Sequence, residues 1–415
     1  MTALPESAPE EGAPRGPLAG VVVLDITRVV AGPFCSMILA DLGATVVKVE
    51  RPSEPDYARD FPPFLEASDG ERFSAFFAQY NRNKLGLTLD LAAPEGKDVL
   101  KRLAARADVL VENFRPGTMD RLGLGHTELR KANPRLVYTA ISGFGQTGPY
   151  RRRPAFDNSA QAAGGLWSMN GYPDRPPARV GTIIGDLAAT MYAVIGTLAA
   201  LRHAEHTGEG QLVDVAQQDS VLSLTENAVV SYTVDGRTAG PLGNAHPFVR
   251  PYELYPCKDG YVFFGGYTDK FWRLTCALFG EPGLADDPET DTMAKRFDPD
   301  VYERRVRPLL HRWMADRTRA ELEELAGDTI PLTAIKDIGE VVSDPHIKER
   351  DMIVDVEYPD FGRLEMFGQP IHLDVTPARP RGLAPRAGEH TDVLLRGLAG
   401  LSDGEIAALR ASGVV

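Results

Sequence analysis

Gly20-Val-Val-Val-Leu-Asp-Ile26 begins the stretch of sequence that decides the fold, and Thr45-Val-Val-Lys-Val-Glu50 ends it. Both runs are short, apolar and rich in valine, as buried strands are. The residues between them, Pro33-Phe-Cys-Ser-Met-Ile-Leu-Ala-Asp-Leu42, predict a helix that stops at Gly43. A strand, a helix and a second strand in this order favour an α/β fold with a largely parallel sheet.

The same alternation continues downstream. Residues 93–106 predict a helix with a proline near its first turn, and residues 108–114 and 136–142 predict two more strands. The pattern changes after residue 218, where helical and loop-rich segments take over. We therefore predict a first α/β unit that ends near residue 218 and a second unit after it.

Composition excludes several classes of protein. The chain has 415 residues and a formal net charge of -13, which disfavours binding to nucleic acid or to an anionic membrane. Three scattered cysteines are too few for a disulfide framework, so we expect a reducing, cytoplasmic location. Residues 1–17 lack the features of a signal peptide and predict a disordered leader.

Gly181-Thr-Ile-Ile-Gly-Asp186 leads into a run of small and apolar residues, Leu187–Leu201. Large apolar residues recur in that run with nearly helical spacing, which predicts a buried helix. The run ends at Arg202 and is shorter than the ~20 residues that a membrane span needs. Taken alone, Asp186 has the position of a helix cap that binds free N–H groups of the first turn.

Common catalytic signatures are missing. The turn Val30–Pro33 lacks the glycines of a dinucleotide site, and no phosphate-binding loop, serine elbow or zinc-protease helix is present. His203 and His206 are close in sequence but lie beside charged residues at a helix end. We expect them to be exposed, and we predict no metal site.

Polar and cationic residues follow several predicted strands. Arg51, Lys84 and Arg121 are candidates for binding an anion at strand ends, where open α/β sheets bind ligands. Each could instead be a solvated surface charge. Asn113 and Phe114 offer an amide and an aromatic face at the end of their strand, although a turn and simple packing would also explain them.

Several of these segments occur together in an order that resembles the class III CoA-transferases. This CaiB/BaiF superfamily includes formyl-CoA transferase and the α-methylacyl-CoA racemases. The resemblance spans roughly residues 18–412. The segments that carry it are Leu24–Phe34, Gly43–Arg51, Glu112–Gly117, Gln161–Gly165, Gly185-Asp186, Thr207–Asp214 and Gly388–Asp392.

The resemblance implies a Rossmann-like large, CoA-binding domain at 18–218, completed by the C-terminal segment 346–415. It further implies a smaller α+β domain at 219–345 and an interlocked homodimer. It also implies that Asp186 is the catalytic aspartate. The implied substrates are an acyl-CoA and a small carboxylic acid, with no tightly bound cofactor. The residues implied to contact CoA are Val29, Arg51, Asn113, Phe114, Thr118 and Arg121, with Lys84 and Leu85 in the matching adenine-side segment.

Phe156 separates two activities found in this superfamily. The related racemases have a histidine before the aspartate that matches Asp157, and they use it to move an α-proton. A phenyl ring at this position can neither accept nor donate that proton, which favours the transferase. The chain also has Val30 where the formyl-CoA transferases have glutamine, and it lacks their triple-glycine loop, so formate and oxalate are not the expected pair.

The predicted reaction is covalent. Asp186 attacks the donor thioester, and a mixed anhydride and then an aspartyl-CoA thioester carry CoA to the acceptor acid. Three alternatives remain: an acyl-CoA racemase or isomerase, intramolecular CoA transfer within a diacid, and CoA binding without catalysis. Weaker candidates for the acid side are Val30, Phe156, Asp157, His246 and Arg250, while Arg151–Arg153 either holds a dicarboxylate or forms a solvated loop.

Overall fold

The computed structural model of the protein describes residues 16–415. They form two compact units: a larger unit of residues 16–167, 179–237 and 345–415, and a smaller unit of residues 168–178 and 238–344. Nearly all of the predicted leader, 1–17, lies outside the described residues.

The units depart from the predicted domains in two places. Residues 219–237 group with the larger unit, because α9 (Gln217–Ser223) packs on α8 (Ile184–Thr207). Residues 168–178 group with the smaller unit. There Asn244 Nδ2 donates a hydrogen bond to the Tyr172 hydroxyl (3.2 Å).

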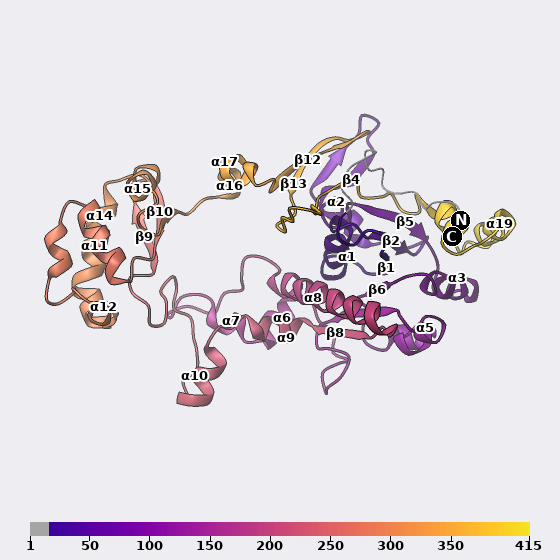
Figure 1. The fold of residues 1–415 in the computed structure, drawn as a ribbon, viewed down its shortest axis with the longest axis horizontal. Coiled ribbons are helices and arrows are strands. Elements are labelled where there is room, and N and C mark those ends of the chain that lie inside the picture. Colours follow the sequence, from indigo (N-terminus) through magenta and orange to yellow (C-terminus); the bar gives the residue numbers. More distant parts are fainter. Residues whose placement is uncertain (1–15) are drawn as a thin grey trace. The chain divides into compact units, whose positions relative to one another are not determined.

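The centre of the larger unit is a six-stranded parallel sheet, as predicted (Figure 1). Its spatial order is β5-β2-β1-β6-β7-β8. The chain builds outward from β1 in one direction, then returns to the other side of β1 and builds the second half. The strands are β1 (Val22–Asp25), β2 (Thr45–Glu50), β5 (Lys84–Thr88), β6 (Val109–Glu112), β7 (Val137–Ser142) and β8 (Leu212–Ala216).

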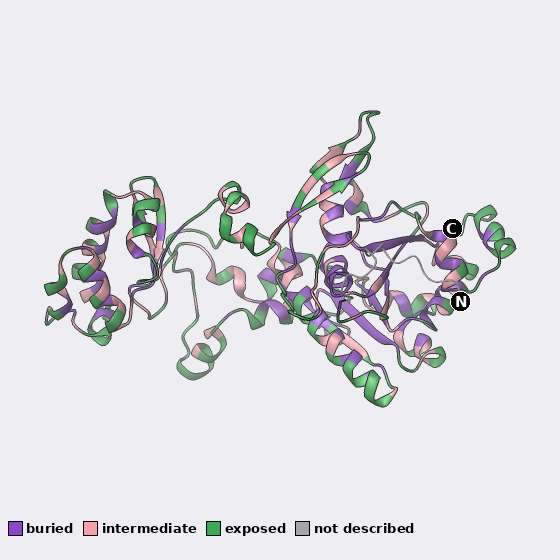
Figure 2. Ribbon diagram, turned by 45° about the horizontal axis from the view of Figure 1, so that its top comes forward, coloured by how far each residue is buried: buried purple, intermediate pink, exposed green. Residues whose placement is uncertain are grey.

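Alternating side chains of the strands fill two cores. Val23 belongs to one core and Leu24 to the other, because successive residues of a strand point to opposite faces. Helices α1 (Ala31–Asp41) and α8 contribute to the first core. The second core contains residues of α3 (Pro94–Ala104), α5 (His126–Ala132), α18 (Thr391–Gly397) and α19 (Asp403–Ala411). The strands are accordingly buried, and the end of the chain returns to the larger unit (Figure 2).

Helix α8 is longer than predicted. It begins at Ile184 and ends at Thr207, 24 residues in all, and by length and composition it could cross a membrane. Half of its most apolar window is buried in the protein, however, and its alanines pack in the core beside α1. This is the behaviour of a core helix in a globular protein.

An outlying part of the larger unit consists of two hairpins around a short helix. Phe73 and Phe77 pack against Tyr358 in their shared core. The elements are β3 (Phe64–Glu66), β4 (Arg72–Ser74), α2 (Ala75–Asn81), β12 (Ile353–Tyr358) and β13 (Gly362–Phe367).

The smaller unit has its own antiparallel sheet, in the order β11-β10-β9. Its core is aromatic: Trp272, Phe279 and Trp313 pack together. The main elements are β9 (Glu253–Cys257), β10 (Gly260–Phe264), α11 (Asp269–Leu278), α14 (Arg307–Ala315), α15 (Arg319–Ala326) and β11 (Leu332–Ala334).

Candidate active site

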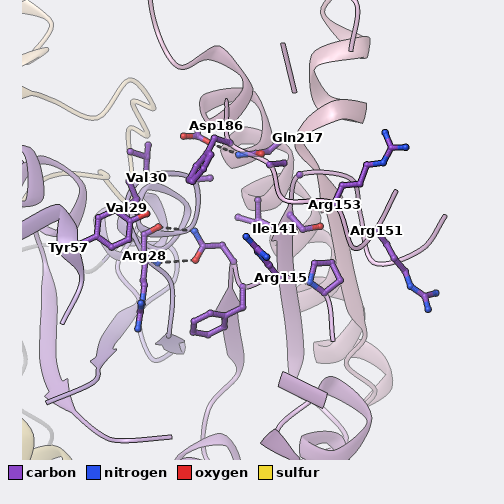
Figure 3. Close-up of a pocket in the computed structure, with 18 residues that line it drawn as sticks. Arg28, Val29, Val30, Tyr57, Arg115, Ile141, Arg151, Arg153, Asp186 and Gln217 are labelled. Carbon is purple, nitrogen blue, oxygen red and sulfur yellow. Dashed lines mark hydrogen bonds between the residues drawn. The ribbon is translucent and has the colours of Figure 1, made fainter. Parts of the chain in front are cut away.

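A cavity of about 290 Å³ lies where four neighbouring strands of the parallel sheet end (Figure 3). The order of the sheet reverses between β1 and β6, and open α/β sheets bind ligands at such a point. The cavity is lined by Arg28–Ala31 after β1, Asn113–Pro116 after β6, Ser142 and Gly143 at β7, and Gln217 after β8, with Asp186 from α8.

Asp186 lies in the first turn of α8 but does not cap it. Ile183 has the N-cap position, and no side-chain hydrogen bond caps the helix from there. Asp157, at the start of α6 (Asp157–Ala163), instead accepts a hydrogen bond from the Gly185 N–H (2.7 Å). The interpretation of Asp186 as a cap is therefore wrong, and its carboxylate is available to the cavity.

The Asp186 carboxylate is half-buried and bonded to a neutral group. Gln217 Nε2 donates a hydrogen bond to Asp186 Oδ1, as Figure 3 shows. Burial, together with the nearby Asp157 charge, raises the pKa of Asp186 to about 7. The position of Asp186 in the first turn of α8 therefore does not keep its pKa low. A carboxylate with a pKa near neutrality is a candidate nucleophile.

The loop after β1 is held firmly against the loop after β6. Asn113 Oδ1 accepts a hydrogen bond from the Arg28 N–H (2.9 Å), and Asn113 Nδ2 donates one to the Arg28 carbonyl (2.8 Å). The next residue, Val29, has a φ of 69°, which is unfavourable for a β-branched side chain. Its N–H donates to the buried Asp56 carboxylate at 3.1 Å, which helps to hold that conformation.

A second cavity of about 160 Å³ continues beyond Arg28 and Phe114, which line both cavities. Arg51 and Thr118, two of the predicted CoA contacts, line this second cavity. Arg51 is half-exposed, with Asp90 Oδ1 at 3.4 Å. Arg121 lines a different hollow, although its Nη2 donates a hydrogen bond to Thr118 Oγ1 (3.0 Å).

Lys84 and Leu85 do not line either cavity, contrary to our expectation. Both lie on β5, the edge strand of the sheet, where Leu85 packs in the core. Lys84 is buried, and its Nζ donates to Asp25 Oδ2 (2.8 Å) and to the Pro33 carbonyl (2.9 Å). Its side chain therefore points into the protein and not toward a ligand.

The candidates on the acid side fall into three groups. Val30 and Phe156 line the first cavity, and Phe156 is 75% exposed. Asp157 is buried and fixes the start of α8, as described above. His246 and Arg250 lie in the smaller unit, where they make local contacts: His246 Nδ1 accepts from the Val249 N–H (3.0 Å), and Arg250 Nη1 donates to the Phe297 carbonyl (3.4 Å).

Several residues of the first cavity were not predicted from the sequence. Gln217 directly follows β8, so the rule for strand ends could have identified it. Arg28, Tyr57 and Arg115 had no distinguishing local pattern. Arg151 and Arg153 do line the cavity, but their side chains are exposed and point away from Asp186 in Figure 3.

Within residues 16–415, no group of three or more histidine, cysteine or carboxylate side chains could hold a metal ion. His203 and His206 are exposed on α8, as predicted.

Known proteins resemble this chain over nearly its whole length. CoA-transferase family III matches residues 18–391. A succinyl-CoA:mesaconate CoA-transferase of Haloarcula hispanica is 39% identical over 385 residues, which are 92% of this chain and 96% of that protein. A succinate–glutarate CoA-transferase of Agrobacterium fabrum is 36% identical over 392 residues, which are 94% of this chain and 96% of that protein.

The similarity extends to solved structures. The crystal structure of a CaiB/BaiF family protein from Brucella suis matches with a TM-score of 0.80 and 33% sequence identity, over 92% of this chain and all of that one. Sequence and fold thus agree across both units. The chain belongs to CoA-transferase family III and is a transferase enzyme.

Proposed function

We propose that the protein transfers CoA from an acyl-CoA to a carboxylic acid and that Asp186 is the nucleophile. The observation that carries this proposal is a half-buried carboxylate, bonded to an amide and not to a cation, at a cavity on the ligand-binding edge of the sheet.

The proposed steps conserve atoms and charge. Asp186 Oδ2 attacks the donor thioester carbon, and CoA leaves as a thiolate from the resulting tetrahedral intermediate, which gives the mixed anhydride. The thiolate then attacks Asp186 Cγ, so that the donor acid leaves with the bridging oxygen and an aspartyl-CoA thioester remains. The acceptor carboxylate reverses both steps and leaves as the new CoA ester.

Burial has two consequences for this nucleophile. It strips water from the carboxylate, which favours attack, and it raises the pKa of Asp186 to about 7. The ionised form is the reactive one, so activity increases as the pH rises through this value and is lost below it.

The two cavities share the lining residues Arg28 and Phe114, which suggests how an acyl-CoA would lie across them. The thioester would meet Asp186 in the first cavity, and the pantetheine arm would pass Phe114. The nucleotide would then reach the second cavity, where Arg51 and Thr118 offer a cation and a hydroxyl to its phosphates. Asn113 would fix the shape of this passage through its two hydrogen bonds to Arg28.

The acid is proposed to be a dicarboxylate. The relatives from Haloarcula and Agrobacterium are named for succinyl-CoA and mesaconate and for succinate and glutarate. Arg115 lines the same cavity as Asp186 and could bind the distant carboxylate of such an acid. We also propose that the protein is an interlocked homodimer, that it is cytoplasmic, and that it binds CoA esters only as substrates.

A racemase is less compatible with the site. Phe156 is exposed at the cavity and cannot transfer a proton. Solvent deuterium entering the α-carbon without exchange of the acid would support racemisation instead. Transfer that proceeds without any added acceptor would indicate the intramolecular variant.

The test uses the purified protein with succinyl-CoA and a panel of mono- and dicarboxylic acids, followed by chromatography of the CoA esters. Wild-type protein is expected to form new CoA esters, and Asp186→Ala and Asp186→Asn are expected to form none. Full turnover by Asp186→Ala would overturn the nucleophile assignment. CoA binding with no transfer to any acid would favour the non-catalytic alternative.

A further inference from the structure

Gln217 contacts the proposed nucleophile, and the reaction steps proposed above give it no role. It is the first residue of α9 and follows β8 directly. Its side chain is 8% exposed and lines the cavity that contains Asp186. The adjacent backbone is anchored to the neighbouring strand end, because the Gln218 N–H donates to the Gly143 carbonyl (3.0 Å).

The amide of Gln217 is the only hydrogen-bond partner of the Asp186 carboxylate within residues 16–415. It binds Oδ1, which leaves Oδ2 to make the bond to the acyl carbon. An amide can donate to a negative oxygen without forming the tight ion pair that a lysine or arginine would form. Gln217 therefore orients the carboxylate and leaves it reactive.

We propose that Gln217 is a catalytic residue, whose Nε2–H stabilises the negative charge that develops on Asp186 Oδ1 while CoA moves through the aspartyl intermediates. This inference rests on the proposed function. When the CoA thiolate attacks Asp186 Cγ in the mixed anhydride, Cγ becomes tetrahedral and Oδ1 becomes an oxyanion. The donor acid then leaves with Oδ2, while Oδ1 remains on the enzyme as the thioester carbonyl.

The same oxygen is charged again in the second half of the reaction. The acceptor carboxylate attacks Cγ of the aspartyl-CoA thioester, and the negative charge returns to Oδ1 before the CoA thiolate leaves. A donor already in place at Oδ1 requires no reorganisation at either step. One side chain thus serves both the formation and the breakdown of the aspartyl-CoA intermediate.

The experiment compares Gln217→Leu and Gln217→Met with Gln218→Leu. Gln218 is the matched control, because its amide donates to the Ala163 carbonyl (3.1 Å) and does not line the cavity. Loss of one preorganised donor lowers kcat about 10²-fold or more. We expect that loss in both Gln217 variants, with little change in the KM for acyl-CoA and with normal activity in Gln218→Leu.

The pH dependence of kcat/KM distinguishes a catalytic role of Gln217 from a purely structural one. A hydrogen bond to the ionised carboxylate stabilises that form, so its removal is expected to shift the acid limb of kcat/KM to higher pH. If both Gln217 variants keep wild-type kcat and an unmoved acid limb, the inference is overturned.

A measurement on the wild-type protein is independent of how the variants fold. The infrared spectrum of the aspartyl-CoA intermediate reports the stretch of the Cγ=Oδ1 carbonyl. The reference is the carbonyl stretch of an acyl-CoA thioester free in solution. A frequency below that of a free thioester is expected for a hydrogen-bonded oxygen, and the frequency of a free thioester would contradict the inference. Absence of any aspartyl-CoA in wild-type protein would instead contradict the proposed function.

Discussion

Two aspartates of the larger unit have opposite chemical environments. Asp25 ends β1 and is fully buried, and its Oδ2 lies 2.8 Å from Lys84 Nζ. Although burial raises its pKa, the charges of Lys48 and Lys84 hold the pKa of Asp25 well below the usual range. Within residues 16–415, the hydrogen-bond partner of Asp186 is an amide, and burial raises its pKa to about 7.

This difference separates a structural carboxylate from a reactive one. The negative charge of Asp25 is paired inside the protein, where it links β1 to β5 through Lys84. The charge of Asp186 faces a cavity and is poorly compensated, so it gains most from bonding to a substrate. Burial alone does not decide the role of an acidic residue; its partners do.

The largest effect is expected for Asp186→Ala. Transfer activity should fall on the order of 10⁴-fold or more, because no other group supplies the nucleophile. CoA ester chromatography measures this loss. The control is Asp174→Ala, which removes an exposed carboxylate from the smaller unit and should leave activity unchanged. Equal losses of activity in Asp186→Ala and Asp174→Ala would show that the loss is not specific to the proposed nucleophile.

Lys84→Met tests the other side of the comparison. Removing one partner of a buried ion pair destabilises a protein by about 3–5 kcal/mol, since Asp25 is left uncompensated. Urea unfolding measures this change, and the folded fraction is expected to keep its KM for acyl-CoA. Lys131→Met is the matched control, because Lys131 pairs with Glu128 on the surface, where such a pair contributes little to stability. An increased KM without destabilisation would place Lys84 at the CoA site after all.

The pH dependence of activity should follow Asp186 and not Asp25. With a pKa near 7, the ionised fraction falls about tenfold per pH unit in acid, so kcat/KM at pH 5 should be about 10²-fold below its plateau. Initial rates between pH 5 and 9 measure the profile. Activity that stays constant down to pH 5 would show that Asp186 is ionised over the whole range.

Arg115→Ala sharpens the proposed choice of acid. Loss of a cation that binds the distant carboxylate should raise the KM for dicarboxylic acids about tenfold and leave monocarboxylic acids unaffected. Arg152→Ala is the control, because Arg152 lines a separate hollow and not the cavity of Asp186. Equal effects on both classes of acid would remove Arg115 from the acid site.

The smallest expected effect is the change in thermal stability of Asp186→Asn. A raised pKa in the folded state means that folding favours the protonated form, so stability falls as the pH rises from the ordinary pKa of an aspartate to about 7. Asp186→Asn removes this cost and should raise Tm by a few degrees, about 2–4 °C, at pH 8. The advantage should shrink at pH 4. A lower Tm than wild type at pH 8 would contradict this account.

The sequence predicted the sheet because its strands are continuous apolar runs, separated by helices with clear stop signals. It also placed Asn113 and Phe114 correctly at the end of a strand, where the cavity lies. It failed for Lys84, because only the packed sheet shows which way an edge-strand side chain points.

Long-range pairs account for the other failures. Asp157 binds the Gly185 N–H across 28 residues, and Gln217 binds Asp186 across 31. Local pattern assigned the helix cap to the nearest acidic residue, and it did not show that Gln217 lies beside Asp186. These contacts exist only after α6, α8 and α9 pack together.

The covalent role of Asp186 is the central claim, and one measurement tests it directly. Wild-type protein is incubated with succinyl-CoA, treated with hydroxylamine and digested, and the peptide that contains Asp186 is analysed by mass spectrometry. The account predicts a hydroxamate at Asp186 that depends on the CoA ester and is absent without it. A protein that turns over while Asp186 stays unmodified, or that carries the hydroxamate at another carboxylate, would contradict the account.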